Sequence, residues 1–315
     1  SGGKDSTFQV LKVLEYGLKP LCVTSTTCDL SDLGRKNIEN IKSFGIDYIE
    51  FTSNKKIRKK LNKIGLEEIG DIAWPEHVGI FTIPVIAAVK FNIPLIVWGE
   101  NSQNEYGGPL SKINNNILDR SWLEEFGGLL GLRVTDLHNA YGIEKKDLLP
   151  YIYPSDEELK KANITGIFLG HYIEWDGSKN AEIASLNGFK SYNKIVEGTA
   201  TPYENLDNYQ HGIHDYFKYI KYGFSRATDQ VCMAIRRKKI TRKDGIDIIK
   251  KYDGKYPNIY LGKKLEDIIK EIGIDKNHFD NICDQFTNKK LFKLDNKKKP
   301  LKDKDGNLIP LFEIE

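Results

Sequence analysis

The chain opens with Ser-Gly-Gly-Lys-Asp-Ser (Ser1–Ser6), and an amphipathic helix is predicted directly behind this segment. Apolar residues recur on one helical face, at Phe8, Val10, Leu11 and Leu14. Two consecutive glycines let the backbone curl with its N–H groups pointing inward, and a helix start adds partial positive charge. The segment therefore predicts a site for an anion, and its hydroxyl and ammonium donors suit a chain of phosphates.

Short apolar strands alternate with helices after this opening. Strands are predicted at Pro20–Thr26, Asp47–Thr52, Pro94–Gly99 and Ile164–Ile173, with helices at Ser31–Phe44 and through Pro84 to Asn92. This alternation predicts right-handed crossovers and a doubly wound α/β fold, in which helices cover both faces of a parallel sheet. Ligands of such sheets bind beyond the carboxyl ends of the strands, where we expect Ser1–Ser6 and Gly99–Asn101 to share one crevice.

The 315 residues predict two regions. Residues 1–175 form the α/β domain, with an irregular or short-helical insertion around 103–163, and 176–315 form a mostly helical region for substrate or a partner. The clearest helix of the second region is predicted at Thr228–Arg237. Because residue 1 is not Met and already lies in a motif, we expect the chain to be truncated at its N-terminus, without the strand that feeds Ser1.

Composition excludes several classes of protein. The formal charge is only +3, so nucleic-acid binding is not indicated, and the basic runs Lys55–Lys63 and Lys289–Lys304 are interpreted as solvated faces. Four scattered cysteines fit neither a disulfide framework nor a metal site with C-x-x-C spacing. No apolar run approaches the roughly 18 residues of a membrane span, and a cytoplasmic location is expected.

The opening segment resembles the PP-loop signature, S-G-G-x-D-S, rather than the Walker A loop. The resemblance implies an adenine nucleotide alpha hydrolase-like fold that cleaves ATP between its α and β phosphates. It implies that the loop holds the departing pyrophosphate and that Asp5 helps to position Mg²⁺. Nucleotide-binding residues implied in this way are Ser1, Gly2, Gly3, Lys4, Asp5 and Ser6, with Thr24, Ser25 and Thr26 near adenine. The alternative is a glycine-rich turn that only begins a helix.

Gly99-Glu100-Asn101 follows the predicted strand Pro94–Gly99. A carboxylate and an amide at a strand's carboxyl end can complete a Mg-ATP site or orient an acyl-type substrate. We therefore expect a catalytic role for Glu100 and a nucleotide contact from Asn101, with a simple strand-ending turn as the alternative.

Three further stretches resemble the N-acetyl sugar amidotransferase family of bacterial surface-glycan biosynthesis, which acts in pseudaminic, legionaminic and O-antigen sugar pathways. They are Phe91–Gly108, Tyr222–Arg237 and Ile240–Gly254. The resemblance implies conversion of a sugar acetamido group to an acetamidino group through an adenylated intermediate, with release of AMP and pyrophosphate. Lys4, Asp5 and Glu100 are the expected catalytic residues.

The sugar, free or nucleotide-linked, is expected to contact two groups of residues. They are Glu105 and Tyr106 after the third strand, and Arg226, Asp229 and Arg236 in the C-terminal region. Arg226 suits a carboxylate or phosphate because its guanidinium binds such groups through two hydrogen bonds. The alternatives are that Arg236 is an ordinary solvated residue and that Tyr106 only packs.

Two histidines are weighed as metal ligands, and two features of the chain differ from the family that it resembles. His211 and His214, with Asp215, have helical metal-site spacing, but no third ligand is evident, so packing or surface roles are favoured. The family carries a Cys-rich, zinc-binding segment before the loop that this chain lacks. Gln230 also stands where the family has histidine.

The source of ammonia and two other functions stay open. No cysteine has the context of a glutaminase nucleophile, so ammonia is expected from a separate glutaminase and channelling subunits that resemble the histidine-pathway synthase. One alternative is a tRNA-modifying PP-loop enzyme that holds RNA at Lys55–Lys63. The other is a nucleotide-binding module without turnover.

Overall fold

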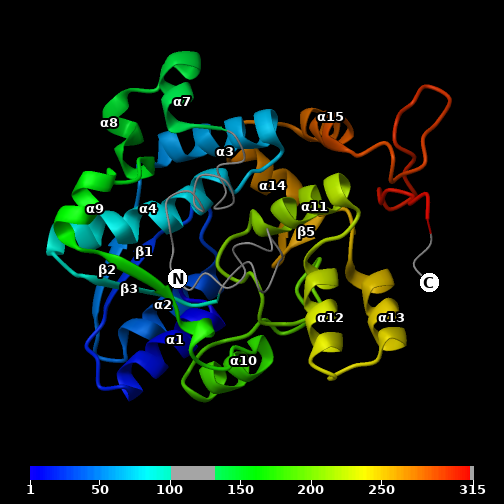
Figure 1. Ribbon diagram of the computed structural model, residues 1–315. Coiled ribbons are helices and arrows are strands. Elements are labelled where there is room, and N and C mark those ends of the chain that lie inside the picture. The colour runs from blue at the N-terminus through cyan, green and yellow to red at the C-terminus, as the bar shows by residue number, and fades with distance from the viewer. Residues whose placement is uncertain (101–131, 313–315) are drawn as a thin grey trace. The chain divides into compact units, whose positions relative to one another are not determined.

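The computed structural model describes residues 1–100 and 132–312 (Figure 1). The predicted site residues Asn101, Glu105 and Tyr106 lie outside the described residues. The protein is a mixed α/β structure in which helices predominate, and it divides into two compact units. The first unit contains residues 1–61 and 74–190, and the second contains residues 62–73 and 191–315.

The first unit contains four strands, which pair in parallel, and the helices that connect or flank them. Its strands are β1 (Leu21–Ser25), β2 (Asp47–Phe51), β3 (Leu95–Trp98) and β4 (Thr165–Phe168). Its helices are α1 (Lys4–Glu15), α2 (Asp32–Lys42), α4 (Trp74–Phe91), α7 (Val134–Tyr141), α8 (Lys145–Leu148), α9 (Asp156–Ala162) and α10 (Gly177–Leu186), with 3₁₀ turns at Leu149–Tyr151 and Leu169–His171. α3 (Lys55–Ile69) contains residues of both units.

Within the described residues the strands pair two by two. β1 pairs with β2 in register Leu21 to Asp47, and β3 pairs with β4 in register Leu95 to Thr165, both parallel. The predicted strands are thus present, but they form two ladders rather than one continuous sheet. α4 contacts both β1 and β3, and Figure 1 shows α4 on one side of the strands and α1 on the other.

The fourth strand is shorter than predicted. β4 covers only part of Ile164–Ile173 because the chain turns into a 3₁₀ helix at Leu169. Leu169 is buried there with Phe8 and Trp175, whose rings meet edge to face at 5.4 Å. Partly buried side chains pack on this cluster, at Val97, Ile173 and Ile183. The early turn therefore supplies the apolar contacts that fix α1 against β3 and β4.

The second unit is mostly helical. It contains α11 (His211–Tyr222), α12 (Arg226–Arg236), α13 (Arg242–Tyr252), α14 (Leu265–Lys270), α15 (Lys276–Phe286) and the antiparallel pair β5 (Ile259–Tyr260) and β6 (Lys263–Lys264). The predicted helix Thr228–Arg237 corresponds to α12. Phe217 of α11 packs edge to face against Phe279 and Phe286 of α15, each at 6.0 Å. No helix in the described residues is both long and apolar enough to cross a membrane.

Candidate functional site

The opening segment curls at the start of α1. Gly3 is the N-cap residue with φ −70° and ψ 166°, and Thr7 donates from its backbone N–H to the Gly3 carbonyl over 2.9 Å. The Ser1 and Ser6 hydroxyl oxygens lie 3.0 Å apart, so the chain folds back across the first turn. The first N–H groups of a helix have no acceptor within the helix. The segment thus has the shape and polarity of an anion-binding loop.

Gly2 sits in a space that admits no side chain. A Cβ atom built on Gly2 would lie 2.6 Å from the Ile38 backbone nitrogen and 2.8 Å from the Asn37 carbonyl carbon. Asn37 is itself held, because its side-chain amide bonds both the carbonyl and the N–H of Lys190, at 3.0 and 2.8 Å. The loop is therefore pressed against a fixed part of α2, and glycine is required there.

Lys4 and Asp5 form the charged pair of the loop. The Lys4 ammonium donates to Asp5 Oδ2 over 2.5 Å, and Lys4 is only 6% exposed. Asn180 of α10 donates from Nδ2 to Asp5 Oδ1 over 2.9 Å. Each carboxylate oxygen keeps acceptor capacity after one such bond, and Asp5 is partly exposed. The sequence missed Asn180, because nothing local marks a partner 175 positions away.

The start of α10 lies close to Lys4. Asp176 caps this helix: its Oδ1 accepts from the Ser178 N–H at 3.0 Å and the Lys179 N–H at 3.4 Å. A Cβ built on Gly177 would lie 3.7 Å from the Lys4 ammonium nitrogen. Two helix starts and a lysine thus lie together, an arrangement that favours negative charge.

The predicted adenine contacts lie at the carboxyl end of β1. The Thr24 hydroxyl lies 2.5 Å from the Tyr48 hydroxyl, and the Thr26 hydroxyl donates to Glu50 Oε1 over 3.2 Å. The Thr26 backbone N–H donates to the Phe51 carbonyl over 2.9 Å. These bonds join the ends of β1 and β2, so the Thr24 and Thr26 side chains serve strand pairing here.

A buried ion pair supports this strand end. Arg58 of α3 and Glu76 of α4 are 2% and 3% exposed, with Arg58 Nη1 and Glu76 Oε1 3.2 Å apart. Arg58 also donates from Nη2 to Ser25 Oγ at 3.4 Å and to the Thr26 carbonyl at 3.3 Å. The interpretation of Lys55–Lys63 as a solvated face is therefore wrong for Arg58, because the helical turn points this residue inward while Lys55, Lys56 and Lys60 are exposed.

Glu100 lies two residues after the end of β3, just beyond Gly99, and is partly exposed. Its neighbour Gly99 lies against Trp175 so closely that a Cβ there would be 3.0 Å from the indole ring. Gln9 of α1 donates from Nε2 to the Val97 carbonyl over 2.5 Å. These contacts bring the end of β3 to α1, the helix that the loop begins.

The predicted sugar-binding residues of α12 belong to the second unit. Arg226 lies near Asp215, with 3.6 Å between Arg226 Nε and Asp215 Oδ1. Asp229 accepts a short bond from Lys218 and is buried, whereas Arg236 is exposed near the end of the helix. Arg226 and Asp229 thus lie in the first turns of α12, and Arg236 lies about two turns beyond Asp229 and nearly three turns beyond Arg226.

Gln230 stands where the sequence resemblance leads us to expect histidine, and it bonds a neighbouring turn. Its side-chain carbonyl accepts from the Ala200 N–H at 2.7 Å, and its amide donates to the Thr201 hydroxyl at 3.2 Å. The residue therefore holds the 199–201 turn against α12. Glutamine does this without any titratable group, so proton transfer at this position is not available.

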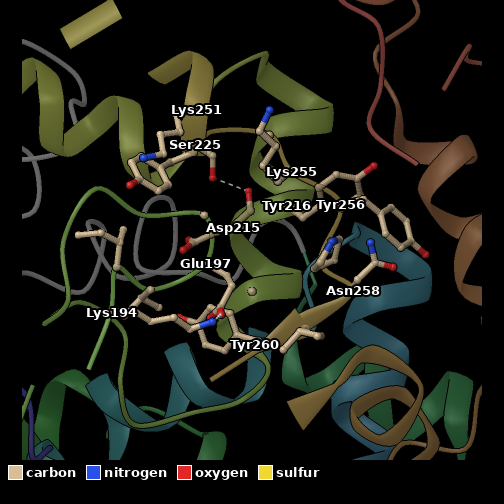
Figure 2. Close-up of a pocket in the computed structure, with 18 residues that line it drawn as sticks. Lys194, Glu197, Asp215, Tyr216, Ser225, Lys251, Lys255, Tyr256, Asn258 and Tyr260 are labelled. Carbon is tan, nitrogen blue, oxygen red and sulfur yellow. Dashed lines mark hydrogen bonds and ion pairs between the residues drawn. The ribbon is translucent and has the colours of Figure 1, made fainter. Parts of the chain in front are cut away.

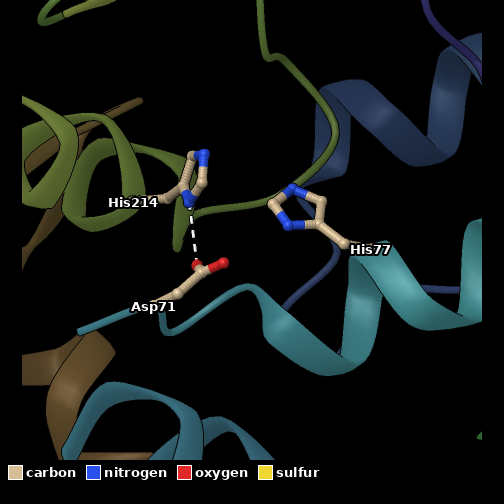
Figure 3. Close-up of side chains that lie close together, drawn as sticks. All are labelled: Asp71, His77 and His214. Atoms are coloured by element: carbon tan, nitrogen blue, oxygen red, sulfur yellow. Dashed lines mark hydrogen bonds and ion pairs between the residues drawn. The ribbon is translucent and has the colours of Figure 1, made fainter. Parts of the chain in front are cut away.

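The two histidines of α11 have carboxylate neighbours from outside the predicted set. Figure 3 shows His214 with Asp71, whose Oδ1 lies 2.8 Å from His214 Nδ1. His211 Nδ1 lies 3.6 Å from Asp207 Oδ1. Asp71 belongs to the 62–73 segment of the second unit, and the sequence gives no signal that it would reach α11.

The comparisons with known proteins concern the second unit. Residues 197–303 match the family described as LPS biosynthesis protein WbpG-like, C-terminal domain. The match covers less than half of the chain and lies within the second unit. It supports a context of lipopolysaccharide biosynthesis, which agrees with the glycan context that the sequence predicts. No curated protein matches the chain at a significant level.

Proposed function

We propose that this protein is a PP-loop ATP pyrophosphatase that transfers nitrogen to the acetamido group of a sugar in lipopolysaccharide biosynthesis. The observation that carries the proposal is the curled Ser1–Ser6 segment at the start of α1, with Lys4 and Asp5 paired beside it. The similarity of residues 197–303 to the C-terminal domain of an LPS biosynthesis family supports the glycan substrate. We extend the doubly wound fold to the whole first unit as part of this proposal.

ATP is needed because an amide oxygen is a poor leaving group. The acetamido oxygen attacks the α phosphorus, and the bond to the β-phosphate oxygen breaks, so pyrophosphate leaves. Ammonia then adds to the carbonyl carbon of the adenylated acetamido group. The bond from this carbon to the former amide oxygen breaks, AMP departs with that oxygen, and the ammonia nitrogen stays in a protonated acetamidino group. Lys4 and the N–H groups of the first turn of α1 offset the charge on the departing pyrophosphate.

Mg²⁺ fits the donor set of this loop. Asp5 is a partly exposed carboxylate, each of whose oxygens accepts one bond, from Lys4 or Asn180. Hard cations prefer such oxygens together with those of phosphate. When bound, the cation would neutralise phosphate charge, while Lys4 and Asn180 keep the Asp5 carboxylate oriented. Ammonia would come from a separate glutaminase, because none of the four cysteines has the sequence context of a glutaminase nucleophile.

The test is turnover by the full chain with ATP, Mg²⁺, an ammonium salt and a panel of nucleotide-linked acetamido sugars. We expect pyrophosphate and AMP, with a sugar product in which NH replaces O by mass. Glutamine in place of ammonium should give no product. Asp5→Asn should lower pyrophosphate release at least about 100-fold with the fold unchanged.

Asp32→Asn is the matched control, because Asp32 lies in the first turn of the neighbouring helix α2 and is exposed. It should leave turnover unchanged. Release of ADP and phosphate in place of AMP and pyrophosphate would contradict the proposal, and so would full activity of the Asp5→Asn variant.

A further inference from the structure

The second unit contains a cavity of about 390 Å³ that has no assigned role. This volume falls in the range of small-molecule sites, roughly 300–1,000 Å³. Figure 2 shows that its walls come from segments that are separate in the sequence: the 194–198 turn, α11, Ser225 before α12, and the chain from Lys251 to Tyr260. All of these residues lie in the second unit.

Tyrosine rings form much of the wall. Tyr216, Tyr252, Tyr256 and Tyr260 all line the cavity. The Tyr256 hydroxyl donates to Asp280 Oδ1 over 2.6 Å and the Tyr260 hydroxyl to the Asn205 carbonyl over 3.0 Å, so both rings are fixed by contacts outside the cavity. Fixed aromatic rings offer an apolar surface of defined orientation. The C–H face of a pyranose ring packs well against such a surface.

Two buried polar atoms of residues on the wall have no hydrogen bond in the described residues. Asp215 is 2% exposed, and its Oδ2 accepts from Asn205 Nδ2 at 3.0 Å. Its Oδ1 has no hydrogen bond there; it has only the ion pair with Arg226, whose Nε is 3.6 Å away and beyond hydrogen-bond distance. The Tyr216 hydroxyl, also buried, has none in the same part of the chain. Buried groups of this kind are costly and almost always have a partner. A ligand that donates to a carboxylate and bonds a phenol, such as a polyol, meets both needs.

The remaining charge on the cavity wall is positive and exposed. Of its three lysines, Lys194 is neutralised by Glu197, with 2.8 Å between Nζ and Oε1. Lys251 and Lys255 are exposed and form no ion pair with another described residue. An anionic group on the ligand would therefore find two available cations, and a neutral ligand would leave them unused.

We propose that this cavity binds a sugar ring that carries a phosphate or carboxylate group. The ring packs on the tyrosines, its hydroxyls bond Asp215 and Tyr216, and the anionic group lies at Lys251 and Lys255. The identification of the sugar as an acetamido sugar rests on the proposed function; the cavity itself recognises the ring and the charge.

The experiment is calorimetric titration of the full chain, without ATP, with four probes. They are N-acetylglucosamine 1-phosphate, glucuronic acid, N-acetylglucosamine and inorganic phosphate. We expect the two anionic sugars to bind roughly tenfold or more tightly than either N-acetylglucosamine or phosphate alone. The stronger of the two anionic sugars identifies whether phosphate or carboxylate is preferred.

Variants locate the binding. The double change Lys251→Ala and Lys255→Ala should weaken both anionic sugars roughly tenfold and leave N-acetylglucosamine unchanged. Tyr252→Ala should weaken all three sugars. Lys243→Ala with Lys250→Ala is the matched control, since these exposed lysines of α13 do not line the cavity and the charge change is the same.

The outcomes separate this proposal from the proposed function. If the cavity variants leave sugar affinity unchanged while the protein releases pyrophosphate, the cavity assignment is overturned and the proposed enzymatic function stands. If the variants weaken sugar binding but the protein releases no pyrophosphate, the cavity assignment stands and the proposed enzymatic function is overturned. Phosphate that binds as tightly as the sugar phosphate would reduce the cavity to a plain anion site and overturn the proposal.

Discussion

The loop of the first unit and the cavity of the second unit are built in opposite ways. Six consecutive residues make the loop, and its charged side chains, Lys4 and Asp5, already bond each other. The cavity draws on segments spread from Lys194 to Tyr260, and it leaves Asp215 Oδ1 without a hydrogen bond in the described residues. A site of consecutive residues can be read from sequence, whereas a site assembled by tertiary packing leaves no pattern to read.

The two units also differ in how they treat acids that water reaches only in part, the partly exposed Glu50 and the buried Asp253. In the first unit, hydrogen bonding to Arg35 lowers the pKa of Glu50 to about 2, so the carboxylate is held ionised. In the second unit, burial raises the pKa of Asp253, although the Thr228 hydroxyl and the Ser225 N–H donate to it. Ionised Glu50 therefore stabilises the folded state at pH values above the pKa that Glu50 has in the unfolded chain. For Asp253 the sign is opposite: the folded state loses stability as the pH rises from the unfolded pKa of Asp253 through its raised folded pKa.

The largest expected effect concerns the buried pair in the first unit. Arg58→Met leaves Glu76 buried without its guanidinium partner, which should lower the free energy of unfolding by about 3–5 kcal/mol in urea titration. In the second unit, Lys218→Met removes the lysine partner of the buried Asp229. Because Lys218 is more exposed than Arg58, water reaches this pair, and the cost should be smaller, about 1–2 kcal/mol.

The double variant Arg58→Met with Glu76→Leu controls for the unpaired charge. It should recover most of the lost free energy of unfolding, because two apolar side chains then replace the buried ion pair and no unpaired charge remains. If Arg58→Met costs no more than Lys218→Met, the contrast between the two pairs is wrong.

A smaller effect is expected from the loop backbone. Gly2→Ala places a Cβ against the α2 backbone and should cost about 1–3 kcal/mol of stability, measured by thermal and urea unfolding. Gly3→Ala is the matched control, because a Cβ there meets only Ser1 Oγ at 3.6 Å; it should stay within about 0.5 kcal/mol. Equal costs for the two variants would show that the loop is not pressed on α2.

The secondary structure of the first unit was partly predictable. Local periodicity placed α1, β1, α2, β2 and β3 within a few residues, and glycines mark several of their ends. It did not identify α3, and it recovered only the second half of α4, which begins at Trp74 rather than near Pro84. The pairing of strands was not predictable to the same degree: the sequence indicates parallel strands but does not determine which of them bond each other.

The site was predictable only where it is local. Ser1–Ser6 stood out in the sequence as a candidate loop, whereas its structural neighbours Asn180 and Arg58 did not. Asn180 reaches Asp5 by tertiary packing, and Arg58 lies in a basic run whose lysines are exposed or partly exposed. Asp215 attracted attention as a neighbour of two histidines, but it lies on the cavity wall instead.

The smallest expected effect concerns pH. Glu50→Gln should cost about 1 kcal/mol at pH 7, an amount limited by solvent screening of the partly exposed Arg35. The folded pKa lies below the unfolded one, so the difference from wild type should be full above pH 5 and vanish as pH falls toward 2. Urea midpoints at several pH values measure it. Glu39→Gln, at a fully exposed acid bonded to Lys42, should change less; a constant Glu50 effect at all pH values would contradict the electrostatic origin.

The 62–73 segment has a consequence for how the protein can be divided. Asn62 donates to Gln210 over 3.2 Å, Asp71 bonds His214, and Lys221 donates to the Gly70 carbonyl over 2.8 Å. A recombinant fragment cut at the start of the WbpG-like match would lose all three attachments and expose the helix face that they cover. An autonomous C-terminal fragment should therefore need residues 62–73 supplied as a peptide or grafted onto its N-terminus.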